Sequence, residues 1–195
     1  MQIKNTFENS FSAYRAALDT ALASVSEVEI DRAVELIHYT MMVGRTIYVC
    51  GNGGSSSIAD MLSAVWMKWV NQNTPQDLNP RVISLSCNTP LITAIANDIG
   101  YEEVFAYQLK SLMQTNDLLV TVSSSGNSPN IRRAIETCQE FGNSCIAFSG
   151  FNGGASNLAD INLHVDSFEY CLVEDAHFAL SHFITRNIIY KENNT

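Results

Sequence analysis

The sequence predicts an α/β fold in which a parallel sheet is covered by helices on both faces. Apolar, β-branched segments alternate along the chain with segments whose apolar residues recur every three or four positions. This alternation is typical of parallel strands joined by crossover helices. Residues 118–122 are apolar or β-branched throughout, as in strands buried on both faces. Two of the expected strands end in Gly- or Ser-rich loops that lead directly into helices.

The composition suits one compact unit of 195 residues, and no linker, low-complexity stretch or internal repeat divides it. We therefore expect a single domain over residues 1–195. Hydrophobic residues make up 46% of the chain, enough for a substantial core, whereas only 16% of residues are charged. A surface with few charges is often buried against copies of itself, which favours a homo-oligomer. The net charge of −9 argues against nucleic acid as the main partner.

The five cysteines are widely spaced, and no pair has the spacing of metal ligands. We expect them to be reduced and mostly buried, as in a cytoplasmic protein. The amino terminus has no basic segment followed by an apolar run, and no segment approaches membrane-spanning length. These features predict a soluble, cytoplasmic protein without membrane association.

Two helices are expected ahead of the first strand. Residues 3–24 carry apolar side chains at three- and four-residue intervals, which predicts an amphipathic helix. Ser26, followed by Glu27 and Glu29, fits the start of a second helix that continues to Gly44. Such an apolar-striped helical pair must pack on something, so residues 1–44 either cover the sheet or pair with another subunit.

The remaining elements follow in alternation. Five strands are expected, at residues 46–50, 81–86, 118–122, 144–148 and 161–165. Further helices are expected at residues 58–70, 91–96, 104–113, 131–141 and 173–190. Trp66 and Trp69 suggest an apolar interface on the helix expected at residues 58–70. Glu174 and Asp175 would open the last helix, where the helix dipole stabilises acidic side chains.

The serine-rich loop 123–128 lies between a buried strand and a helix. It reads Ser-Ser-Ser-Gly-Asn-Ser, and Pro129 suits the first turn of the helix that follows. Free backbone N–H groups and the positive end of the helix dipole converge at such a loop, while serine hydroxyls add neutral donors. The loop therefore suits an anion such as a phosphate. A serine-rich turn with a serine cap is the alternative explanation.

A glycine-rich loop, Gly51-Asn52-Gly53-Gly54-Ser55, follows the first strand in the same way. Its glycines allow a positive φ and a close approach of the backbone to a ligand, and Ser55 can cap the next helix. The loop lacks the Gly-x-Gly-x-x-Gly spacing of dinucleotide sites and the lysine of nucleotide-triphosphate loops. A plain strand-to-helix turn is the alternative. Two such loops at one sheet edge together suggest a small phosphorylated ligand.

The two loop motifs resemble those of the sugar isomerase (SIS) domain. Within that group the chain is most similar to the sedoheptulose 7-phosphate isomerases, also called phosphoheptose isomerases. The resemblance includes the helical pair, the motif Ala96-Asn97-Asp98, and the segment from Glu174 to His182. It implies a three-layer sandwich with a five-stranded parallel sheet, and usually a tetramer whose sites lie between subunits. It implies no organic cofactor.

The resemblance also implies which residues hold the ligand. The phosphate would be bound by residues matching Ser55, Ser123, Ser124, Ser125 and Ser128. The sugar would be bound by residues matching Asn52, Gly53, Asn97 and Asp98, although Asp98 could instead simply hold its own loop. The implied reaction moves a proton between adjacent carbons through an enediol, which needs a base within hydrogen-bond reach.

The sequence departs from the family pattern at the positions of the catalytic acid–base residues. The family's histidine and glutamate positions are Met61 and Val65, and neither side chain can accept a proton. Some family members hold a metal through those two positions, so no metal is expected here. The last-helix histidine is retained as His182, and the nearby family glutamine corresponds to Glu174. These two are the candidate catalytic residues, with His177 in a supporting role; a packed or capping histidine is the alternative for His182.

Three functions remain open at this point. The first is aldose–ketose isomerisation of a sugar phosphate, with Glu174 and His182 moving the protons. The second is a phosphosugar-binding regulator without catalysis, which the loss at Met61 and Val65 favours. The third is an assembly or interaction protein, which has no need of an intact anion site. The partner expected in the first two cases is a small-molecule sugar phosphate.

Overall fold

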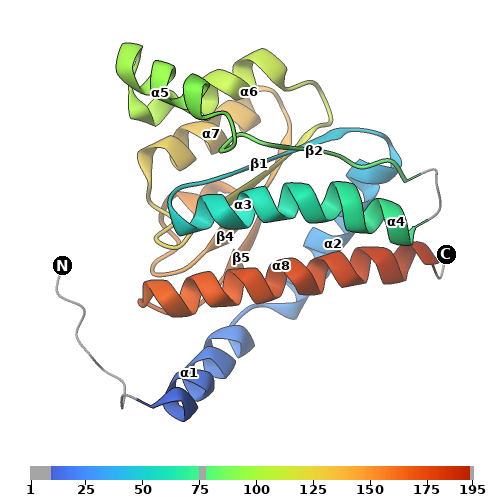
Figure 1. The fold of residues 1–195 in the computed structure, drawn as a ribbon, viewed down its shortest axis with the longest axis vertical. Coiled ribbons are helices and arrows are strands. Elements are labelled where there is room, and N and C mark those ends of the chain that lie inside the picture. The colour runs from blue at the N-terminus through green and yellow to red at the C-terminus, as the bar shows by residue number, and fades with distance from the viewer. Residues whose placement is uncertain (1–9, 75–77, 194–195) are drawn as a thin grey trace.

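The computed structural model describes residues 10–74 and 78–193. At its centre is a five-stranded parallel sheet in the order β2-β1-β3-β4-β5 (Figure 1). The strands are β1 (Thr46–Gly51), β2 (Arg81–Ser84), β3 (Leu118–Ser123), β4 (Ser144–Ser149) and β5 (Ile161–His164). The α-helices are α1 (Phe11–Ala23), α2 (Glu27–Met42), α3 (Gly54–Val65), α4 (Asn71–Asn73), α5 (Thr89–Asp98), α6 (Ala106–Leu112), α7 (Pro129–Glu140) and α8 (Tyr170–Asn193).

The helices form a layer on each face of the sheet, which confirms the predicted three-layer α/β class (Figure 1). Alternate residues of each strand point to opposite faces. On β3, Leu118 and Val120 pack with α2, α3 and α8, whereas Leu119 packs with α5, α6 and α7. All three side chains are fully buried, as expected for a strand covered on both sides.

The strand order has a switch point between β1 and β3. The chain leaves β1 to form β2 on one side and later returns to form β3 on the other. Gly51 at the end of β1 lies beside Val122, one residue before the end of β3. The loops that follow these two strands therefore leave the sheet side by side, at the position where open α/β sheets bind ligands.

The helical pair before the sheet uses its two members differently. Helix α2 covers the sheet: Ile37 and Met41 are buried in the core beside strand residues such as Ile47. Helix α1 instead lies along α8, where the Tyr14 hydroxyl donates to Asp175 at 2.7 Å. The expected helix began at residue 3, and residues 3–9 lie outside the described part of the chain.

Two sequence-based expectations are wrong in detail. Trp66 is fully buried rather than at an interface, and its indole N–H donates to Thr185 of α8 at 2.9 Å. Trp69, three residues further on in the same π-helical turn (Trp66–Val70), is 39% exposed. The last helix begins at Tyr170, so Glu174 and Asp175 lie in its second turn, beyond the first-turn N–H groups that would stabilise acids.

The cysteines are free and mostly buried, as the sequence analysis expected. All five cysteines are free; Cys50, Cys138 and Cys145 are buried, whereas Cys87 and Cys171 are exposed. Burial raises the pKa of the Cys138 thiol to about 12, so this side chain stays protonated and inert. In the described ranges, no helix is long and apolar enough to cross a membrane.

Candidate functional site

The glycine loop is hydrogen-bonded to the start of α7, the helix that follows the serine loop, at the carboxyl edge of the sheet. Asn52, in the first loop, donates from Nδ2 to Oδ1 of Asn130 at 2.8 Å, and Asn130 donates back from Nδ2 to Oδ1 of Asn52 at 2.8 Å. Asn130 is the second residue of α7 and lies two residues after the end of the serine loop. We call residues 51–55 together with 123–128 the two-loop cradle.

The glycine loop turns tightly because its glycines allow it. Gly53 has a φ of +53°, which side-chain-bearing residues rarely adopt. A Cβ on Gly51 would lie 2.5 Å from the backbone oxygen of Ser55, so only glycine permits this approach. Helix α3 begins at Gly54, which puts Ser55 in its first turn rather than in a loop. Ser55 is buried.

The serine loop satisfies some of its hydroxyls internally and leaves one without a partner. Ser123 Oγ accepts the N–H of Gly126 at 3.2 Å, and Ser125 Oγ accepts the N–H of Asn127 at 3.3 Å. Ser124 Oγ is buried and has no hydrogen-bond partner among the described residues. A buried hydroxyl left in this state costs about 1–3 kcal/mol. The hydroxyls of Thr121, Thr137 and Ser156 are in the same state, and Ser124 is the one of these four residues that lies in the serine loop, where a ligand can supply the missing partner.

Ser128 lies at the amino terminus of α7. It is the N-cap residue of that helix, yet its hydroxyl makes no capping hydrogen bond. The hydroxyl therefore stays available to an anion at the positive end of the helix dipole. The five serines predicted to bind phosphate lie in the first turn of α3 or between the end of β3 and the start of α7.

The loop after β4 packs against the serine loop at Gly126. A Cβ on Gly126 would lie 2.1 Å from the backbone oxygen of Gly153, and Gly126 has a φ of +64°. The Ser156 N–H donates to the Gly126 carbonyl oxygen at 3.2 Å. Gly126 is therefore required to be glycine for two independent reasons. The serine pattern in the sequence gave no sign of this contact with residues 153–156.

Glu174 reaches the cradle from α8. A Cβ on Gly54 would lie 2.6 Å from both carboxylate oxygens of Glu174, so this carboxylate rests against the start of α3. Helices α3 and α8 run side by side (Figure 1). His182 is exposed on α8, eight residues and about 12 Å along the helix axis from Glu174. Within one chain the structure thus brings Glu174, but not His182, to the cradle.

His177 is a buried supporting residue in this structure. Its Nε2–H donates to the backbone oxygen of Ser149 at the end of β4, 3.1 Å away, and its ring stacks edge-on against Phe148. Burial lowers the pKa of His177 to about 4, so the ring is neutral at pH 7. The neutral ring anchors α8 to the strand that borders the serine loop.

The positions of the missing histidine and glutamate are apolar and packed. Met61 and Val65, one turn apart on α3, both pack against the hydrophobic core. Neither offers a nitrogen or carboxylate oxygen to a divalent cation of the kind that some family members hold. The described residues include no cluster of three or more His, Cys, Asp or Glu side chains suited to a metal. The residues here do not fit a metal at this position.

Asn97 and Asp98 end helix α5, and both are exposed. Asn97 Nδ2 donates to Asp98 Oδ1 at 2.7 Å. A few residues later, the Tyr101 hydroxyl donates to Asn52 Oδ1 at 2.9 Å and so ties this segment to the glycine loop. Sequence reasoning missed both Tyr101 and Asn130 as site residues. Asn130 stood beside the serine motif, whereas Tyr101 carried no recognisable signal.

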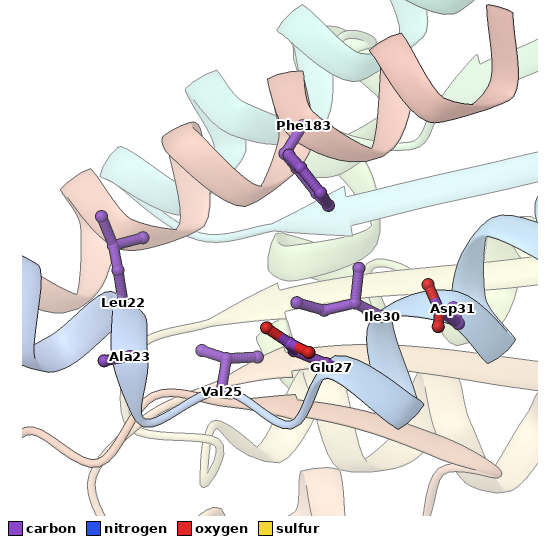
Figure 2. Close-up of a pocket in the computed structure, with 7 residues that line it drawn as sticks. All are labelled: Leu22, Ala23, Val25, Glu27, Ile30, Asp31 and Phe183. Carbon is purple, nitrogen blue, oxygen red and sulfur yellow. The ribbon is translucent and has the colours of Figure 1, made fainter. Parts of the chain in front are cut away.

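A separate groove of about 370 Å³ opens between the α1–α2 connection and α8 (Figure 2). It is lined by Leu22, Ala23, Val25, Glu27, Ile30, Asp31 and Phe183. The charged groups that line it are the carboxylates of Glu27 and Asp31, which repel an anion. This groove does not suit a phosphate, in contrast to the cradle.

Comparison with known proteins identifies the family of this chain. A family model described as SIS domain matches residues 10–150. The phosphoheptose isomerase of Helicobacter pylori (strain P12) is 34% identical over 183 residues, which cover 93% of each chain. That of Campylobacter concisus is 31% identical over 188 residues, covering 95% of this chain and 96% of the relative.

Solved structures also show similarity to this family. The structure of a phosphoheptose isomerase from Francisella tularensis superposes with a TM-score of 0.83 at 28% identity, covering 91% of this chain and 95% of that one. The sequence resemblance, the strand order and the cradle at the switch point all lead to one assignment. The chain belongs to the SIS domain family and, within it, to the family of the phosphoheptose isomerases.

Proposed function

We propose that this protein binds a sugar phosphate in the two-loop cradle and interconverts its aldose and ketose forms. The observation that carries the proposal is the buried Ser124 hydroxyl, which lacks a protein partner in the serine loop. A phosphate oxygen supplies the partner. In this proposal Ser55, Ser123, Ser124, Ser125 and Ser128 bind the phosphate, and Asn52, Gly53, Asn97 and Asp98 bind the sugar.

Glu174 is the proposed base. Its carboxylate rests against Gly54 at the start of α3, next to Gly53, one of the residues proposed to bind the sugar. The carboxylate takes the proton from the carbon next to the carbonyl, which gives an enediol, and returns it to the neighbouring carbon. His182 assists proton movement between the oxygens. Because His182 lies about two turns along α8, it serves the cradle of a neighbouring subunit in this proposal.

The proposed assembly is a homotetramer of single-domain chains in the cytoplasm, with residues 1–44 contributing to subunit contacts. Its support is the number of large apolar side chains left on the surface, among them Phe11, Phe168, Phe183 and Tyr190. Such residues favour burial against copies of the chain. Sedimentation velocity should give four times the chain mass of 21.5 kDa. A monomer would remove the proposed role of His182.

The second candidate is a phosphosugar-binding regulator without isomerase activity. The observation that favours it is the packing of Met61 and Val65 into the core at the family's acid–base positions. Both candidates share the cradle and differ only in turnover. A pure interaction protein is less well supported, because it gives no reason for a buried, unpartnered serine at a sheet edge.

One assay separates the two candidates. We expect sedoheptulose 7-phosphate to raise the melting temperature, because a ligand bound only by the folded state stabilises it. We then expect the wild type to isomerise it, and Glu174→Gln to reduce kcat by about 10²-fold or more while binding is retained. His182→Ala should reduce kcat less. Binding without turnover in the wild type would establish the regulator, and turnover unchanged in Glu174→Gln would remove Glu174 as the base.

A further inference from the structure

The side-chain amide of Asn52 is held by two partners. It exchanges hydrogen bonds of 2.8 Å with Asn130 in both directions, and its Oδ1 also accepts from the Tyr101 hydroxyl at 2.9 Å. Asn130 is 1% exposed. The two partners come from different elements, α7 and the 3₁₀ turn Tyr101–Glu103, so the glycine loop is clamped from both sides.

This arrangement fixes what Asn52 can offer to a ligand. An amide oxygen has two acceptor sites and an amide nitrogen has two N–H donors. Both acceptor sites of Oδ1 are used, one by Asn130 and one by Tyr101, whereas Nδ2 has given only one of its two hydrogens. The single remaining hydrogen-bonding group is an N–H. Asn52 can therefore meet an acceptor atom of the ligand and cannot receive a hydroxyl proton.

We propose that Asn130 and Tyr101 are positioning residues that hold Asn52 as a donor toward the sugar carbonyl oxygen. This inference rests on the proposed function. In an open-chain sugar phosphate the carbonyl oxygen can only accept, and it gains negative charge as the enediol forms. A donor already oriented toward that oxygen stabilises the charge without reorganisation. The clamp also joins Asn52 to the segment that carries Asn97 and Asp98, which sets the distance between the two sugar-binding segments.

Four variants test the proposal. Asn130→Ala and Tyr101→Phe remove the positioning partners, Asn52→Ala removes the donor, and the fourth combines Asn52→Ala with Asn130→Ala. We expect Asn130→Ala to reduce kcat/KM for the sugar phosphate about tenfold, mainly in kcat, and Tyr101→Phe to reduce it several-fold. Affinity for inorganic phosphate, measured by calorimetry, should stay within about twofold. The double variant should lose no more than Asn52→Ala alone, because both act through one amide.

Matched controls separate positioning from general damage. Asn143→Ala removes a buried amide that bonds Asn116 and Gln114 at 2.8 Å each, and Tyr107→Phe removes an exposed hydroxyl on α6. The first should lower the melting temperature without the kcat loss, and the second should change neither. If Asn130→Ala does not fold, Tyr101→Phe at the exposed hydroxyl decides the question.

Each outcome has a distinct meaning. Additive losses in the double variant, or an equal loss of inorganic-phosphate affinity, would overturn the positioning role and leave the proposed function intact. An unchanged kcat in both Asn130→Ala and Tyr101→Phe would do the same. A wild type that binds sugar phosphate but does not turn it over would overturn the catalytic proposal; the positioning role would then have to appear as a loss of sugar-phosphate affinity in Asn130→Ala. A wild type that binds no sugar phosphate would overturn both.

Discussion

At the scale of single residues, the serines of the cradle differ although the sequence makes them look alike. Ser123 and Ser125 bond within their own loop, Ser128 leaves its capping position unused, and Ser124 is buried without a partner. The sequence could place all of them at the end of a strand, because the apolar run and the proline mark the boundaries. It could not predict which hydroxyl lacks a partner, since that depends on the loop's own fold.

Replacing Ser124 should weaken ligand binding without harming the fold. In Ser124→Ala a buried hydroxyl with no partner is exchanged for a methyl group, so we expect the melting temperature of the free protein to stay the same or rise. Affinity for the sugar phosphate should fall about tenfold in a calorimetric titration. The matched control is Ser149→Ala, because Ser149 Oγ donates to Asn162 at 2.7 Å. That control should destabilise the free protein, and a similar loss in Ser124→Ala would contradict our account of this hydroxyl.

At the scale of elements, the sequence predicted which segments are strands and helices better than where they begin. The alternation of β-branched segments with segments whose apolar residues recur every three or four positions predicted all five strands. Helix α3 starts at Gly54 rather than Ile58, because the following serines join its first turn. Helix α8 starts at Tyr170, three residues before the expected start at residue 173. That one-turn difference removes Glu174 from the helix end, and the packing of α8 along α3 places its carboxylate against Gly54.

The contact between α3 and α8 gives a test at this scale. Gly54→Ala adds a Cβ where the Glu174 carboxylate now lies, 2.6 Å away, so the carboxylate must move. Because alanine is the better helix former, we expect the melting temperature to stay equal or rise slightly. Turnover should fall at least tenfold, since small misplacements of a catalytic group are costly.

The comparison variant is Gly126→Ala, whose Cβ would meet a backbone oxygen rather than a mobile side chain. That variant should be destabilised as well as impaired. Full activity in Gly54→Ala would show that the carboxylate position is not important for the reaction.

At the scale of the whole molecule, the predicted class, strand number and layers were right, whereas the contact of Tyr101 with the glycine loop was not foreseen. Parallel strands bring their carboxyl ends to one edge, so the meeting of the two loops follows from the fold class. The link from Tyr101 to Asn52 depends on how α5 and its following turn pack over that edge. Trp66 and Trp69 show the same limit, because periodicity cannot tell which of two neighbouring aromatic residues enters the core.

The stability of the whole molecule should depend on pH through His177. Its folded-state pKa is about 4, below the ordinary value of 6.5, so the unfolded chain binds a proton here that the folded protein does not. The contribution of this residue is complete above pH 6.5 and is lost as the pH falls toward 4, by up to about 3 kcal/mol. Urea unfolding of the wild type and of His177→Gln at pH 7 and pH 5 measures it. Between pH 7 and pH 5, the free energy of unfolding should fall less in the variant than in the wild type. An equal fall in both proteins would contradict this assignment.

The backbone contact between Gly126 and Gly153 restricts how this protein can be redesigned. Both residues have a left-handed φ, and no side chain separates their main chains. An engineer who wishes to admit a longer sugar by inserting residues into the serine loop must therefore rebuild the loop after β4 at the same time. The two loops will tolerate change only as a pair, and libraries that diversify one of them alone should yield few folded clones.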